Sequence, residues 1–139
     1  MRALGIDFGE RRIGLAISDS EGSFALPFGT LERTSDRSAI DRIARIAASE
    51  GVGRLVVGEP VGLDGARGPG ALRARRFAER LGAATGLPHE MVGEALTTVA
   101  AIERLRAAGV DTRKERHRID AVAAQILLEE ALSRGRANG

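Results

Sequence analysis

Cysteine and the larger aromatic residues are missing from this sequence of 139 residues. There is no Cys, Trp or Tyr, and four Phe are the only aromatic side chains. Without cysteine the chain cannot form disulfides, thiolate metal sites or a cysteine nucleophile. A chain without disulfides fits the cytoplasm, and we expect a cytoplasmic protein. With so few aromatic rings, base stacking is not the obvious way for this chain to bind a nucleic acid.

Long apolar runs are also missing. No run approaches the roughly 20 residues of a membrane-spanning helix, and Asp7 interrupts any apolar core of an N-terminal signal peptide. We therefore expect no membrane partner. Hydrophobic residues make up 43% of the chain, which is enough for a packed core. The length and composition predict a single domain over residues 1–139.

Lysine is nearly absent, because Lys114 is the only lysine among 21 basic residues, and the formal net charge is +2. The planar fork of arginine suits phosphate groups. A codon bias explains the total count more simply, so clustering is the better guide. Two clusters, in 67–76 and 113–118, supply the candidates for salt-sensitive contacts with nucleic-acid phosphates: Arg67, Arg73, Arg75, Arg76 and Arg116.

The apolar pattern alternates with period two at the start of the chain and changes to helical spacing afterwards. Strands are expected at 2–8, 12–18 and 24–33, joined by short turns into an antiparallel meander. Pro27 cannot donate to a strand ladder, so the third strand belongs at a sheet edge. After the meander we expect a helix at 36–50, a strand at 54–60, a Gly-rich loop at 62–70, a helix at 71–85 and a strand at 88–94. A further helix should run from Thr97 or Thr98 to Gly109. The residues 112–115 have capping-box spacing, so they should begin a last helix that ends at about residue 133.

This order of elements predicts an α/β fold with helices on both faces of a mixed sheet. Strands separated by helices pair in parallel through right-handed crossovers. With the third strand at an edge, a five-stranded sheet of order 3-2-1-4-5 is the natural arrangement. The first strand, which carries Asp7, then lies in the centre.

Asp7 is unusual because it lies within "LGIDFG", a stretch that reads as a buried strand. A lone buried carboxylate costs several kcal/mol unless a partner satisfies it. Sites in α/β sheets form outside the carboxyl ends of the strands, where Glu59 and Glu94 also end strands. Asp120, early in the last helix, could point to the same edge, and His117 shares its helix face.

Several carboxylates that converge on one point repel each other unless a cation lies between them. Sites made of oxygen ligands select Mg²⁺ or Mn²⁺. Two such ions about 4 Å apart stabilise both the attacking and the leaving oxygen in phosphodiester cleavage. The residues therefore favour a metal-dependent nuclease, with a divalent metal as the partner of Asp7.

Four motifs in order resemble the YqgF (RuvX) family of ribonuclease H-like proteins, described as Holliday junction resolvases and pre-16S rRNA nucleases. They are "LGIDFGERRIGLAISD", "VVGEPVGLDGARGP", "GEALTT" and "RIDAVAAQILLEEAL". The resemblance implies a ribonuclease H-like fold and a hydrolase that matures the 5′ end of pre-16S rRNA. It also implies that Asp7, Glu94 and Asp120 are the catalytic, metal-binding acids. Arg12 occupies the family's basic turn position, which makes it a further candidate phosphate contact.

Three positions depart from the family pattern. Gly93 stands where the family has Asp, Ala95 where it has Arg, and Glu59 where it has an apolar residue. Glu59 matches the strand-four acid of the related RuvC resolvases, so we hypothesise that it compensates for Gly93. His117 suits a RuvC-like His-x-x-Asp arrangement. Glu59 and His117 are thus additional site candidates, although each also suits a solvated surface position.

Three alternative functions stay open. The first is resolution of branched DNA, which needs two coordinated cuts and hence a homodimer rather than a monomer. The second is a nucleotide-phosphate binder, because "GIDFG" also resembles the first phosphate loop of sugar kinases and actin-like ATPases. The third is a nucleic-acid-binding module with a weak or dead site. The expected partners are RNA precursors or branched DNA, and ribosomal precursor particles.

Overall fold

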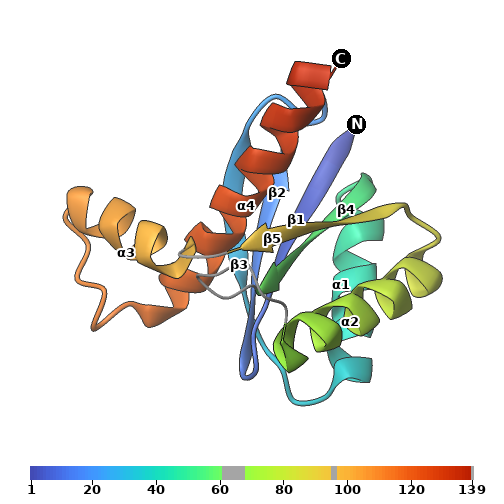
Figure 1. Ribbon diagram of the computed structural model, residues 1–139, viewed down its shortest axis with the longest axis horizontal. Helices are drawn as coiled ribbons and strands as arrows, with labels where there is room; N and C mark the ends of the chain where they lie inside the picture. Colours follow the sequence, from blue (N-terminus) through green and yellow to red (C-terminus); the bar gives the residue numbers. More distant parts are fainter. Residues whose placement is uncertain (61–67, 95–96, 139) are drawn as a thin grey trace.

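A computed structural model describes residues 1–60, 68–94 and 97–138 of the chain, which form one five-stranded sheet with helices on both faces (Figure 1). The strand order is β3-β2-β1-β4-β5, as the sequence predicts. In chain order the elements are β1 (Arg2–Phe8), β2 (Arg12–Ser18), β3 (Ala25–Glu32), α1 (Asp36–Ser49), β4 (Val52–Pro60), α2 (Pro69–Thr85), β5 (His89–Glu94), α3 (Thr97–Ala107) and α4 (Arg116–Asn138).

The sheet is mixed. The first three strands form an antiparallel meander, and β1, β4 and β5 pair in parallel through the helical crossovers. Pro27 lies in the edge strand β3, where a missing N–H donor costs least. The central position of β1 places Asp7 between two neighbouring strands.

Each face of the sheet has its own core, because side chains alternate along the strands. Leu4 and Ile6 of β1 pack on the face covered by α1 and α2. Ala3 and Val56 pack on the other face, against Leu128 of α4. Figure 1 shows α1 and α2 on one side of the sheet and α4 on the other. Within the described residues, no helix has the length and apolar character needed to cross a bilayer.

The last helix begins later than the sequence predicts. Residues 112–115 form a turn, and α4 starts at Arg116. Asp111 causes the difference: its side chain accepts a hydrogen bond from the Arg113 N–H at 3.0 Å, and its carbonyl accepts from Lys114 and Glu115. These local bonds offer the backbone an alternative to the helix. Residues 62–67, which are most of the Gly-rich loop expected at 62–70, lie outside the described residues.

Two glycines allow α4 to lie directly on the sheet. A Cβ atom on Gly5 would come within 2.9 Å of the Leu128 Cβ, and one on Gly14 would overlap the backbone carbonyl of Asp120. The absence of side chains at these positions therefore sets how closely the helix approaches. It also fixes the height of Asp120 above β2.

We expect Gly14→Ala to destabilise the protein by about 2 kcal/mol, because the added methyl group would push the first turn of α4 off the sheet. Gly29→Ala, on the neighbouring strand β3, is the matched control. No heavy atom lies within 4 Å of the position that a Cβ atom would take at Gly29. Urea unfolding of both variants measures the difference. Equal unfolding free energies in the two variants would show that the close approach at Gly14 does not hold.

Candidate active site

Asp7 is partly buried near the end of the central strand, on the face of the sheet that α4 covers. Its partners in register are Gly14 on β2 and Gly58 on β4. Both flanking positions lack a side chain. The space that side chains would fill at these two positions is taken by the backbone of Asp120 over Gly14 and by the side chain of Glu94 over Gly58, so both acids come close to Asp7.

Glu94 reaches Asp7 from the end of β5, which is two strands away. A Cβ atom on Gly58 would lie 2.8 Å from Glu94 Oε2, so the Glu94 side chain crosses directly over this glycine. Thr97, at the start of α3, donates its hydroxyl to the same Oε2 at 3.1 Å. This bond holds the carboxylate of Glu94 in its position above β4.

The pKa of Asp7 is raised from its ordinary value of 3.8 to about 9. Burial is the largest cause, because it disfavours the charged form. A hydrogen bond with Glu94, and the negative charges of Glu94 and Asp120, raise the pKa further. Near neutral pH and without a cation, Asp7 thus holds a proton that it shares with Glu94. The three acids that the sequence singles out act on one another in the folded chain.

Asp120 is held from the side by Arg12. The Nε of Arg12 lies 2.8 Å from Asp120 Oδ2, with 44% of the arginine side chain and 23% of the aspartate side chain exposed. The sequence suggested Arg12 as a phosphate contact, and the structure adds this ion pair with an acid of the candidate site. Because a single Nε bond engages only one oxygen, Asp120 Oδ1 stays outside the contact.

The donor chemistry of these residues fits a hard divalent cation. Three carboxyl groups supply only oxygen atoms, the ligands that Mg²⁺ and Mn²⁺ prefer. Burial and the charges of the other two acids both raise the pKa of Asp7, and a cation at this point would offset both effects. Across residues 1–60, 68–94 and 97–138, however, no group of three or more His, Cys, Asp or Glu side chains is already arranged to hold a metal ion.

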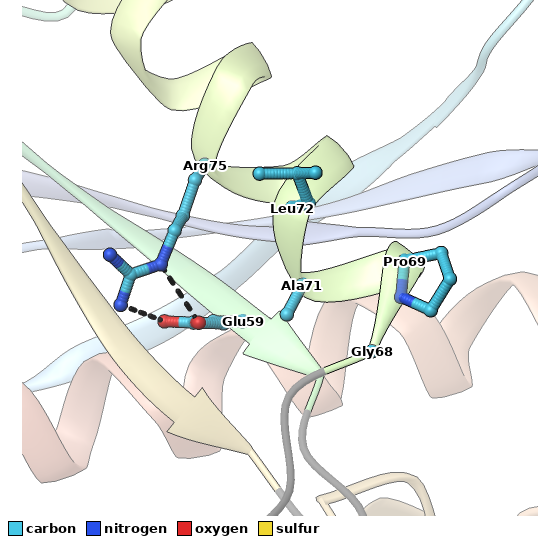
Figure 2. Close-up of a pocket in the computed structure, with 6 residues that line it drawn as sticks. All are labelled: Glu59, Gly68, Pro69, Ala71, Leu72 and Arg75. Atoms are coloured by element: carbon cyan, nitrogen blue, oxygen red, sulfur yellow. Dashed lines mark hydrogen bonds and ion pairs between the residues drawn. The ribbon is translucent and has the colours of Figure 1, made fainter.

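Glu59 does not join these acids. It follows Gly58, so it points to the opposite face of the sheet, where it is 1% exposed. Arg75 of α2 donates to both of its oxygens, from Nε at 2.9 Å and from Nη2 at 3.1 Å (Figure 2). The hydrogen bond and charge of Glu59 raise the pKa of Arg75. The structure therefore does not support the hypothesis that Glu59 compensates for Gly93 beside Asp7.

The pair of Glu59 and Arg75 lies at one side of a surface hollow of about 530 Å³. Figure 2 shows the other described residues that line it, which are Gly68, just before α2, and Pro69, Ala71 and Leu72 of its first turn. Leu72 is exposed there. Arg75, expected to contact phosphate, is committed to a buried carboxylate on the face away from Asp7.

The remaining candidates lie on the surface or outside the described residues. His117 is exposed at the start of α4, where its carbonyl accepts a hydrogen bond from Thr30 at 2.6 Å. Arg73 forms an ion pair with Glu10 at 3.5 Å. Arg76 and Arg116 are exposed, whereas Arg67 and Ala95 lie outside the described residues.

Sequence reasoning missed three residues that build this site: Gly14, Gly58 and Thr97. The two glycines carried a signal, because they pair with Asp7 once the strand order 2-1-4 is assumed. Thr97 was expected only as a helix cap. Its bond to Glu94 depends on the side-chain direction, which the sequence does not contain.

Comparison with protein families now identifies the group to which the chain belongs. The model of the family RuvX, described as "Holliday junction resolvase", matches residues 1–134. The chain belongs to the RuvX family. Among curated relatives, a "Putative pre-16S rRNA nuclease" of Chloroflexus aggregans is 46% identical over 129 residues, which is 93% of this chain and 91% of the relative. A relative of the same name from Anaeromyxobacter sp. strain K is 42% identical over 134 residues, 96% of this chain and 98% of the relative.

Solved structures support the ribonuclease H-like fold of this RuvX-family chain. Thermus thermophilus RuvC in complex with a Holliday junction substrate superposes with a TM-score of 0.64 at 16% identity, covering 100% of this chain and 98% of that one. The fowlpox virus resolvase in complex with Holliday junction DNA superposes with a TM-score of 0.57 at 10% identity, and the match covers 98% of this chain and 99% of the resolvase chain. Membership of the RuvX family and the likeness to these curated relatives make the protein a nuclease, a hydrolase of phosphodiester bonds.

The raised pKa of Asp7 makes the stability of the metal-free protein depend on pH. The unfolded chain releases this proton near 3.8, and the folded chain keeps it to about 9. The contribution of Asp7 to stability is therefore fully present below pH 3.8, declines above it, and is lost as the pH rises through 9. In the wild type, the titration of this one proton should lower the free energy of unfolding by up to about 1.4 kcal/mol per pH unit. We expect Asp7→Asn to remove this pH dependence, because asparagine does not titrate.

Urea unfolding in EDTA at pH 5, 7 and 9 measures this difference. From pH 5 to pH 9 the unfolding free energy of the wild type should fall relative to that of the Asp7→Asn variant, so that the difference between the two proteins changes steadily with pH. Parallel pH profiles for the wild type and the variant would contradict the shared-proton arrangement of Asp7 and Glu94.

Arg75 should matter for folding, because it neutralises the buried Glu59. We expect Arg75→Gln to lower the thermal midpoint, since an ionised carboxylate would be left buried with a weaker partner. The double variant Arg75→Gln/Glu59→Gln should recover part of the loss. Arg76→Gln, at the neighbouring exposed arginine of α2, is the control and should leave the midpoint unchanged. A midpoint for Arg75→Gln equal to that of the control would mean that the pair does not stabilise the fold.

Proposed function

We propose that this RuvX-family nuclease cleaves phosphodiester bonds with Mg²⁺ or Mn²⁺ held by Asp7, Glu94 and Asp120. The observation that carries the proposal is the convergence of the three acids on the end of β1, where Glu94 crosses over Gly58 on one side of Asp7 and Asp120 lies over Gly14 on the other. Burial and these two neighbours together raise the pKa of Asp7. A site that is costly without a cation is suited to binding one. The oxygen-only donor set supports the choice of a hard divalent ion.

The residues of the chain would divide the work as follows. When bound, the metal supplies positive charge next to the reacting phosphate. Asp7 would be a metal ligand held in place by the pairing of β1 on both sides, and Thr97 keeps Glu94 turned toward it. Arg12 keeps Asp120 from swinging into solvent. In-line attack of water then leaves a 5′-phosphate and a 3′-hydroxyl, as in the related nucleases.

The substrate that we favour is the 5′ end of the 16S rRNA precursor. Support comes from the name that curated relatives of 40% identity and more share over most of this chain. Such a substrate places the protein in the cytoplasm, in contact with ribosomal precursor particles.

Branched DNA is the second candidate substrate. The RuvX model is described as "Holliday junction resolvase", and the RuvC neighbour was solved on a junction. Symmetric cleavage of a junction needs two active sites related by a two-fold axis, and hence a homodimer. Light scattering on the purified protein separates the candidates, because a monomer that stays monomeric on DNA argues for single cuts in RNA.

We expect Asp7→Asn to lower Mn²⁺-dependent cleavage by at least about a hundredfold, because it removes the central charged ligand. Glu59→Gln is the control, an acid on the opposite face of the same sheet edge, and should keep most of the activity. The assay uses labelled rRNA-precursor ends beside four-way junctions, so that it also ranks the two substrates. Nucleic-acid binding without turnover in the wild type would instead mean a binding module with an inactive site.

A further inference from the structure

A hollow of about 240 Å³ lies on α1, on the opposite face of the sheet from the acids. The described residues that line it are all polar or charged: Ser35, Arg37, Ser38, Asp41, Arg42 and Arg45. All three arginines are exposed, and within the described part of the chain none of them forms a salt bridge. Elsewhere in the chain, Arg12, Arg33 and Arg75 are each bound to a carboxylate.

The hollow is tied to the same sheet edge as the acids. Glu32, near the start of α1, pairs in register with Arg12, the ion-pair partner of Asp120. Arg33 donates to the carbonyls of Gly9 and Glu10 in the turn that follows Asp7, and its other end binds Asp36 in the first turn of α1. These bonds fix the start of α1 to the turn between Asp7 and Arg12. A strand of nucleic acid that leaves the acids over this turn would meet α1 next.

We infer that this hollow is a second phosphate-binding site, which takes the backbone of a nucleic acid whose reacting bond lies at Asp7. The inference rests on the proposed function. Arginine forks and serine hydroxyls are common donors to phosphate oxygens. No apolar residue is among the described lining residues, so the hollow lacks the hydrophobic centre that is typical of a protein–protein contact.

The dimensions of the helix suit several nucleotides. Arg37 and Arg45 are eight residues apart, which corresponds to about 12 Å along the helix axis. One strand of a duplex advances about 3.4 Å per nucleotide, so the three arginines span about three or four nucleotides. Because the contacts would be to the backbone, this site positions the substrate without reading its sequence.

The test is the triple variant Arg37→Gln/Arg42→Gln/Arg45→Gln, made in the Asp7→Asn background so that the RNA stays intact. Its dissociation constant for a labelled 30-nucleotide single strand should rise about tenfold or more, and the salt slope should fall by about 2, at roughly 0.7 per lost contact. Arg104→Gln/Arg106→Gln/Arg134→Gln, on α3 and α4, removes the same charge elsewhere and is the matched control. Asp41→Asn, which removes the one acid of the hollow, should tighten binding.

Cleavage assays with otherwise wild-type protein distinguish this inference from the proposed function. The triple variant at the hollow should raise KM for long RNA and leave kcat/KM for bis(p-nitrophenyl) phosphate unchanged, because that diester is too small to reach α1. If the triple variant matches its control on long RNA in both binding and KM, the second site is refuted while the nuclease proposal stands. If the wild type cleaves neither substrate and binds no nucleic acid, both are refuted.

Discussion

The contact between the carboxyl groups of Asp7 and Glu94 is the constraint that the rest of this site accommodates. The two residues belong to strands that are separated by β4, so an ordinary strand residue at position 58 would keep them apart. Gly58 leaves the space through which Glu94 crosses. Gly14, on the other side of Asp7, lets the first turn of α4 come down on β2 and bring Asp120 to the same place. Glycine is a poor strand residue, and its use at both positions flanking Asp7 is explained by what must pass over it.

Such a cluster works against stability, and the surrounding structure offsets it. Burial and two negative neighbours disfavour the ionised form of Asp7. The second core, with Val56, Leu127 and Leu128 all fully buried, holds α4 against the sheet in spite of this repulsion. Thr97 and Arg12 each restrain one of the other two acids through a single bond, which leaves further oxygen atoms outside those contacts. Glu94 and Asp120 are therefore each restrained by a neighbouring side chain, which limits the movement that would bring the three acids onto a cation.

The sequence predicts the fold better than it predicts the site, for identifiable physical reasons. The strand order could be predicted from Pro27, which places β3 at an edge, and from the change from strand spacing to helix spacing along the chain. An edge position for β3 together with right-handed crossovers leaves few alternative strand orders. Glu59 was misjudged since it was placed by its position at a strand end. Successive side chains of a strand point to opposite faces of the sheet. Because Gly58 is in register with Asp7, Glu59 points to the face opposite Asp7. The start of α4 was misplaced because Asp111 competes for the same backbone N–H groups. Ion pairs such as Arg12 with Asp120 join residues 108 positions apart, and no local pattern contains them.

The acids at the end of β1 and the arginines of α1 have opposite effects on the binding of a nucleic acid. A group of carboxylates repels the polyanion that a nuclease must hold, and a bound ion compensates only at the reacting phosphate. Attraction for the remaining backbone has to come from elsewhere, and at a distance that leaves the acids free. Arginines placed beside Asp7 would pair with the acids, as Arg12 does with Asp120. The arginines of α1 lie on the opposite face of the sheet from the acids, so in the second site that we infer they would attract the nucleic-acid backbone without pairing with those acids.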